Sequence, residues 1–168
     1  MEMEPYQRET TKRLSLGDKR GLAFSEEILN HLEAKNISAC FMCRTCSSSC
    51  PVAALEGGFD PLRLIRMCLY GLWEDVLNEP TLWLCTSCYA CQERCPQNIK
   101  IADFITLLKN SAMKKGDPPA GVKAQREIII QAGRVYPIDD FDNKKRAKMG
   151  LPELPTTCDV VARLIGGK

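Results

Sequence analysis

The feature that most constrains this chain is a cysteine pattern that occurs twice. The sequence contains ten cysteines, and eight of them form two copies of the spacing C-x2-C-x2-C-x3-C-P, one over residues 40–51 and one over residues 85–96. The start of the sequence shows no pattern typical of a secretory signal peptide, and the cytosol keeps thiols reduced. The repeat therefore predicts metal binding or redox chemistry rather than disulfide bonds.

The composition argues against several other classes of protein. The 168 residues are 45% hydrophobic and 26% charged, which is typical of a soluble globular domain. No apolar run approaches the roughly 18 residues of a membrane-spanning helix. The net charge of +2 argues against a protein that neutralises many phosphates of a nucleic acid. We therefore expect a cytoplasmic chain with one core that neither binds nucleic acid nor inserts into a membrane.

The repeated spacing is the signature of [4Fe-4S] binding in bacterial two-cluster ferredoxins. Three thiolates at positions i, i+3 and i+6 can wrap one tight loop around a cubic cluster, and the proline after the fourth cysteine suits the first turn of a helix that leads away. In two-cluster ferredoxins this fourth cysteine ligates the other cluster. We therefore predict two [4Fe-4S] clusters, the first held by Cys40, Cys43, Cys46 and Cys95 and the second held by Cys85, Cys88, Cys91 and Cys50.

Zinc is the main alternative to iron–sulfur clusters, because soft thiolates also bind zinc. Zinc sites usually consist of two separated C-x2-4-C pairs, which a third cysteine at i+6 and a trailing proline fit poorly. The two remaining cysteines, Cys68 and Cys158, fall on apolar faces of predicted helices, where we expect small buried side chains rather than ligands. His31 is the only histidine and lies far from the motifs, so we expect a structural or surface role for it.

The segments around the motifs predict an all-α core. Ser25 is a candidate N-cap for a short helix before the first motif. Asp60 followed by Pro61 predicts a helix over about 61–70, because this pair is typical of an N-cap and a first helical position. Apolar residues at helical spacing predict a helix from Ile101 that stops at Gly116. Nothing between the motifs alternates over the length of a strand.

We predict three parts along the chain. Residues 1–20 have little apolar periodicity and form an N-terminal arm, and residues 21–116 form the core with both motifs. Residues 117–168 form a C-terminal helix over about 120–132 and a tail with a short terminal helix. This tail carries too little apolar surface to fold alone, so we expect it to dock on a partner.

The residues around the motifs resemble the C subunits of the heterodisulfide reductases, which are members of the α-helical ferredoxin superfamily. The paired motifs alone indicate the superfamily. The closer resemblance rests on the run Asp60-Pro61-Leu62-Arg63 through Gly71, on Trp83-Leu84-Cys85-Thr86-Ser87-Cys88-Tyr89, and on Gln92-Glu93-Arg94-Cys95-Pro96 followed by Ile99-Lys100-Ile101. Arg44 stands where we expect glycine in many relatives, but this difference changes no predicted ligand.

The resemblance implies an oxidoreductase subunit that transfers electrons. The A subunit of such a complex, with flavin and iron–sulfur groups, would pass electrons through the two clusters to the B subunit, which reduces a disulfide. In the anaerobic, methanogenic version this substrate is the heterodisulfide of coenzymes M and B, and hydrogenase or formate dehydrogenase subunits can join through the A subunit. This chain has no C-C-G segment of the kind that the B subunit contains and no G-x-G-x-x-G fingerprint, so we predict no catalytic residue in it.

Other iron–sulfur proteins of the superfamily fit the sequence less well. Succinate dehydrogenase iron–sulfur subunits need further cysteines that residues 1–39 lack, and glycolate oxidase iron–sulfur subunits have a long additional region for which 168 residues leave no room. Two alternatives stay open. One is the equivalent subunit of a related sulfur-metabolism or quinone-linked complex, and the other is a stand-alone diffusible ferredoxin, against which the long arms count.

Overall fold

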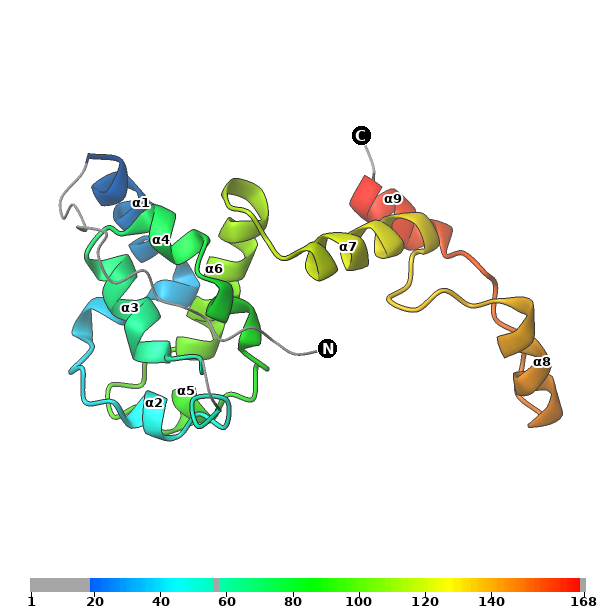
Figure 1. The fold of residues 1–168 in the computed structure, drawn as a ribbon, viewed down its shortest axis with the longest axis horizontal. Coiled ribbons are helices and arrows are strands. Elements are labelled where there is room, and N and C mark those ends of the chain that lie inside the picture. Colours follow the sequence, from blue (N-terminus) through cyan, green and yellow to red (C-terminus); the bar gives the residue numbers. More distant parts are fainter. Residues whose placement is uncertain (1–18, 56–57, 167–168) are drawn as a thin grey trace. The chain divides into compact units, whose positions relative to one another are not determined.

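The computed structural model describes residues 19–55 and 58–166, and it assigns helices and no strand to them (Figure 1). The predicted all-α fold is therefore confirmed. The chain divides into two compact units, residues 1–117 and residues 118–168. The first unit contains α1 (Lys19–Leu29), η1 (Leu32–Ala34), η2 (Ile37–Ala39), α2 (Thr45–Ser48), α3 (Pro61–Leu69), α4 (Trp73–Leu77), η3 (Pro80–Leu84), α5 (Ala90–Glu93) and α6 (Ile101–Lys115). The second contains α7 (Ala120–Ala132), α8 (Asp140–Lys148) and α9 (Asp159–Gly166).

The predicted N-terminal arm over residues 1–20 lies outside the described residues except for its last two positions. Those two positions already belong to α1, which begins at Lys19. None of the helices in the described ranges is both long enough and apolar enough to cross a membrane.

The core of the first unit is formed where α3 and α4 pack on α6 and α1 packs on α4. The apolar stripe predicted for α6 is buried in this core, and it consists of Ile101, Phe104, Ile105, Leu108 and Ala112. The helix ends at Gly116, as predicted. Figure 1 shows the two short motif helices, α2 and α5, next to each other at one end of this unit, and α2 contacts α3 while α5 contacts α6.

The start of α3 follows directly from its sequence. The Asp60 carboxylate accepts a hydrogen bond from the backbone N–H of Leu62 at 3.0 Å and another from that of Arg63 at 3.4 Å. Pro61 occupies the first helical position, where no N–H is needed. The helix predicted over about 61–70 is thus confirmed over 61–69, with Asp60 as its N-cap.

The prediction that Ser25 is an N-cap is wrong. Ser25 lies in the middle of α1 and is buried, and its hydroxyl donates to the backbone carbonyl of Cys68 at 2.7 Å. Phe24 and Ile28 are buried one turn apart, so tertiary packing extends the helix toward the N-terminus beyond the local capping signal. The hydroxyl therefore joins α1 to the last turn of α3.

Two glycines let α1 approach the end of α3. A Cβ atom at Gly21 would collide with the backbone carbonyl of Gly71, and Gly71 itself has a φ of +70°. A side chain at position 21 would therefore push the two helices apart, and one at position 71 would be strained. Both positions need glycine.

The second unit is built on α7, which contacts α9. The helix ends at Gly133 with a φ of 66°, as predicted for a glycine stop after residue 132. The sequence did not predict α8, which begins with a capping box between Asp139 and Asp142. Asn143 in α8 exchanges two hydrogen bonds with the backbone of Leu154, at 2.9 and 3.0 Å, and these bonds hold the following segment against the helix.

Candidate iron–sulfur site

The two cysteine motifs have the same backbone conformation. Cys40 and Cys85 begin the loops with φ and ψ of −63° and 121° and of −63° and 120°. The residue immediately before the motif helix has a positive φ in both loops, 64° at Arg44 and 63° at Tyr89. The repeat in the sequence is therefore a repeat in the structure.

Left-handed residues give each loop its tight curvature. Met42 and Ser87 form an equivalent pair with φ of 56° and 55°, two residues before Arg44 and Tyr89. None of these four residues is glycine, so each position costs on the order of 1–2 kcal/mol. Backbones of this kind form concave nests of N–H groups that bind anions, including iron–sulfur clusters. In the first loop the N–H of Met42 already donates to the Cys40 sulfur at 3.4 Å.

The eight motif cysteines line two separate cavities. Both are small cavities that are partly open to solvent. The thiols around one cavity are those of Cys40, Cys43, Cys46 and Cys95, and those around the other are Cys50, Cys85, Cys88 and Cys91. The structure thus brings the fourth cysteine of each motif next to the first three of the other motif. These are the same two groups of four as the predicted ligand sets, while ligation itself stays a prediction.

The donor set and the shape of each cavity fit a [4Fe-4S] cluster. The four thiols of a group lie around the empty space rather than converging on one point. A cubic cluster spreads its four irons over such a space, whereas a zinc ion needs every sulfur at about 2.3 Å. Apolar side chains complete the lining at Leu62, Ile99 and Ile101 of the first cavity and at Phe59 and Ala102 of the second, where Thr86, Ser87 and Tyr89 also contribute.

The thiols of a cavity differ in how readily they lose their protons. Burial raises the pKa of Cys46, and it raises the pKa of Cys91 to about 11. At the exposed rim, a hydrogen bond with the Thr45 hydroxyl lowers the pKa of Cys43. Because the ligand form of cysteine is the thiolate, binding of a metal group at the buried thiols has to release protons.

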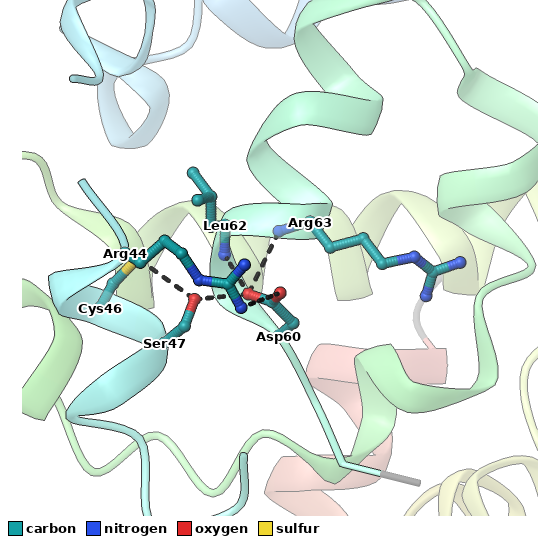
Figure 2. Close-up of polar contacts among 6 residues, drawn as sticks. All are labelled: Arg44, Cys46, Ser47, Asp60, Leu62 and Arg63. Atoms are coloured by element: carbon teal, nitrogen blue, oxygen red, sulfur yellow. Dashed lines mark hydrogen bonds and ion pairs between the residues drawn. The ribbon is translucent and has the colours of Figure 1, made fainter. Parts of the chain in front are cut away.

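A hydrogen-bond network around Asp60 ties the first motif to α3 (Figure 2). The Ser47 hydroxyl donates to the carboxylate of Asp60 at 2.5 Å, while Asp60 also caps α3. The Arg44 guanidinium lies 3.9 Å from the other carboxylate oxygen. The sequence predicted the cap but not the bond from Ser47, since a capping aspartate carries no signal for a partner 13 residues earlier.

Two polar contacts lie beside the second motif. Lys109 in α6 donates to the backbone carbonyl of Cys85 at 2.8 Å, and the Tyr89 hydroxyl donates to Asp103 at 3.4 Å. Sequence reasoning did not identify Lys109, which lies in the middle of α6, ahead of the two lysines in the last turn of that helix. It brings a positive charge close to the start of the second loop.

The cysteines and the histidine outside the motifs are not among the residues that line the two cavities. Cys68 is fully buried in the apolar core, as predicted, and this burial raises its pKa to about 12. Cys158 is only half-buried and precedes α9, which begins at Asp159, so the prediction of a buried side chain on a helix face is wrong for it. His31 is exposed and pairs with Glu33. None of the three lines either cavity.

Comparison with known proteins gives consistent similarities. Residues 36–99 match the family model of a 4Fe-4S dicluster domain. The C subunit of the H2:CoB-CoM heterodisulfide,ferredoxin reductase of Methanothermobacter marburgensis is 40% identical over 137 residues, which cover 80% of this chain and 71% of that protein. The C subunit of the ferredoxin:CoB-CoM heterodisulfide reductase of Methanosarcina mazei is 37% identical over 135 residues, covering 79% and 83%. The iron-sulfur C subunit of the CoB-CoM heterodisulfide reductase of Methanopyrus kandleri is 33% identical over 132 residues, covering 79% and 68%.

Proposed function

The chain belongs to the family of heterodisulfide reductase C subunits, and we propose that it relays electrons through its two [4Fe-4S] clusters between the other subunits of such a complex. At the coarser level it is an iron–sulfur electron-transfer subunit of an oxidoreductase. The single observation that carries the proposal is the pair of adjacent cavities, each lined by four thiols.

The proposed ligands are the two groups of four cysteines that line the cavities. When bound, a [4Fe-4S] cluster accepts and releases one electron at a time. Cys46 and Cys50 stand at different cavities although they are only four residues apart. Four residues span at most about 14 Å even when fully extended, so the two cavities are neighbours. This arrangement supports passage of an electron from one cluster to the other within the chain.

The other residues of the cavities have complementary tasks in this proposal. The apolar walls, with Leu62 and Ile99 at the first cavity and Phe59 at the second, keep water from the inner faces of the clusters. Cys43 and Cys88 are exposed, so a cluster that they helped to hold would be accessible to a partner on that side. All eight motif thiols are used as ligands, so no open iron position is left for a substrate sulfur.

The proposed electron path leads from the flavin-containing A subunit through this chain to the B subunit, where the disulfide is reduced. The names of the relatives support the heterodisulfide of coenzymes B and M as the substrate of the complex. We assign partner docking to the second unit. This assignment is supported by large apolar side chains that are exposed there, among them Tyr136, Phe141 and Met149.

The isolated chain with both clusters is expected to accept electrons without reducing a disulfide. In a stopped-flow experiment under anaerobic conditions, a strong reductant should bleach the cluster absorption. The reduced chain should then stay reduced in the presence of the coenzyme heterodisulfide, because no iron is open to a substrate sulfur. Addition of the B subunit should restore oxidation.

A Cys68→Ala variant is the matched control, because it removes a free thiol that lines neither cavity. It should behave like the unsubstituted chain. Rapid oxidation of the isolated reduced chain by the heterodisulfide would contradict the role as a conduit. A failure to accept electrons at all would contradict the proposed function itself.

A further inference from the structure

The two cluster loops share one backbone conformation but carry different residues at the first position of the motif helix. Position 45 begins α2 and holds threonine, and the equivalent position 90 begins α5 and holds alanine. The Thr45 Oγ1 atom lies 3.2 Å from the sulfur of Cys43. Alanine at position 90 has no group that could make the same contact with Cys88.

The direction of this hydrogen bond follows from the chemistry of the ligand. A cysteine that ligates iron is a thiolate and has no proton to donate. The proton must therefore come from the Thr45 hydroxyl, which donates to the sulfur of Cys43.

The neighbouring serines direct their hydroxyl groups elsewhere. Ser48 and Ser49 donate to the backbone carbonyl of Thr45, at 3.1 and 2.6 Å. Ser47 lies 4.0 Å from the sulfur of Cys46, but its single proton is donated to Asp60 at 2.5 Å, as Figure 2 shows. Among the four hydroxyl side chains of residues 45–49, Thr45 is thus the one that donates to a ligand sulfur.

A hydrogen bond to a ligand sulfur favours the reduced state of a cluster. Reduction adds negative charge, part of which resides on the sulfurs, and a donor stabilises that charge. We infer that Thr45 raises the reduction potential of the cluster held by Cys40, Cys43, Cys46 and Cys95, and that the loop around residues 85–91 lacks this effect because residue 90 is alanine. The inference rests on the ligand sets given under the proposed function. In this inference Thr45 acts through the sulfur of Cys43 and sets the reduction potential of one cluster.

Asp60 lies near the first loop and Lys109 near the second, so the two potentials also differ for reasons other than Thr45. The test therefore compares each cluster with the same cluster in the unsubstituted chain. Midpoint potentials of the full chain with both clusters are measured by redox titration with electron paramagnetic resonance. Thr45→Val keeps the shape of the side chain and should lower one of the two potentials. Thr45→Ser restores a hydroxyl and should bring that potential back. Ala90→Thr introduces the missing hydroxyl and should raise the other potential.

The outcomes separate this inference from the proposed function. Two intact clusters with unchanged potentials in both Thr45→Val and Ala90→Thr would overturn the inference and leave the proposed function standing. Stoichiometric zinc or a single cluster in the unsubstituted chain would overturn the proposed function. If one variant fails to bind its cluster, the other decides, because the two substitutions act at different loops. A Thr45→Ser chain with the potential of Thr45→Val would also contradict a role for the hydroxyl.

Discussion

Replacing Cys95 with serine is expected to damage the cluster at the first motif, although Cys95 belongs to the second motif. The reason is that Cys95 lines the same cavity as Cys40, Cys43 and Cys46. Serine offers a harder oxygen ligand in place of a soft thiolate, so the iron at this corner should be lost or held in an altered state. Electron paramagnetic resonance and Mössbauer spectroscopy of the reconstituted variant measure this change.

Two further variants provide the reference spectra for this experiment. Cys43→Ser changes the first cluster and Cys88→Ser changes the second, whichever way the fourth cysteines are shared, because both residues lie in the three-cysteine part of their own motif. The spectrum of Cys95→Ser should match that of Cys43→Ser, and Cys50→Ser should match Cys88→Ser. Cys158→Ala should leave both clusters intact. A Cys95→Ser spectrum that matches Cys88→Ser would refute the crossed assignment.

Replacing Glu79 with glutamine is expected to destabilise the first unit by about 3 kcal/mol, because it breaks a buried ion pair by removing one partner. The Glu79 side chain is 3% exposed and lies 2.6 Å from the guanidinium of Arg63. Its other carboxylate oxygen accepts from the hydroxyl of Thr81 at 2.8 Å. Arg63 is 35% exposed, so water can solvate its charge once the carboxylate is gone. The expected destabilisation therefore lies at the low end of the range for buried ion pairs.

This ion pair joins α3, which follows the first motif, to η3, which precedes the second. Unfolding of Glu79→Gln by denaturant, with both clusters bound, can be monitored by circular dichroism and by cluster absorption. Both signals should therefore change in one transition, at a lower denaturant concentration than in the unsubstituted chain. The matched control is Arg44→Gln, since Arg44 is 72% exposed and lies 3.9 Å from Asp60. That change should cost less than about 1 kcal/mol. Equal transition midpoints for the two variants would show that the buried pair contributes no more than the exposed one.

Local signals predicted several helices of the fold correctly. The pair Asp60-Pro61 was sufficient for α3, because an aspartate cap and a proline at the first helical position act through the adjacent backbone alone. Gly133 likewise marks the end of α7 through its own left-handed conformation. In contrast, Ser25 has the composition of a cap but lies inside α1, since burial of its neighbours decides the helix start. The capping box of α8 was present in the sequence but was hidden in a run of mixed charge.

The candidate site shows the same division between local and non-local information. The spacing of the cysteines predicts the loops, because three thiols within seven residues can share one turn of backbone. It does not predict the tertiary partners of the loops, such as Lys109, which is 24 residues from the carbonyl it binds. Nor does the spacing indicate which of the hydroxyl side chains of residues 45–49 contacts a sulfur. The structure distinguishes them, because only the Thr45 hydroxyl donates to a sulfur, while Ser47 donates to Asp60 and the two following serines donate to the backbone carbonyl of Thr45.

The central claim is that this chain holds two [4Fe-4S] clusters that carry electrons. The most direct measurement is the content of iron, acid-labile sulfide and zinc in the anaerobically reconstituted full chain, combined with the number of electrons taken up in a reductive titration. We expect about eight irons, about eight sulfides and about two electrons per chain, with no stoichiometric zinc. Stoichiometric zinc, or a fully loaded sample with about four irons and about one electron, would contradict the claim.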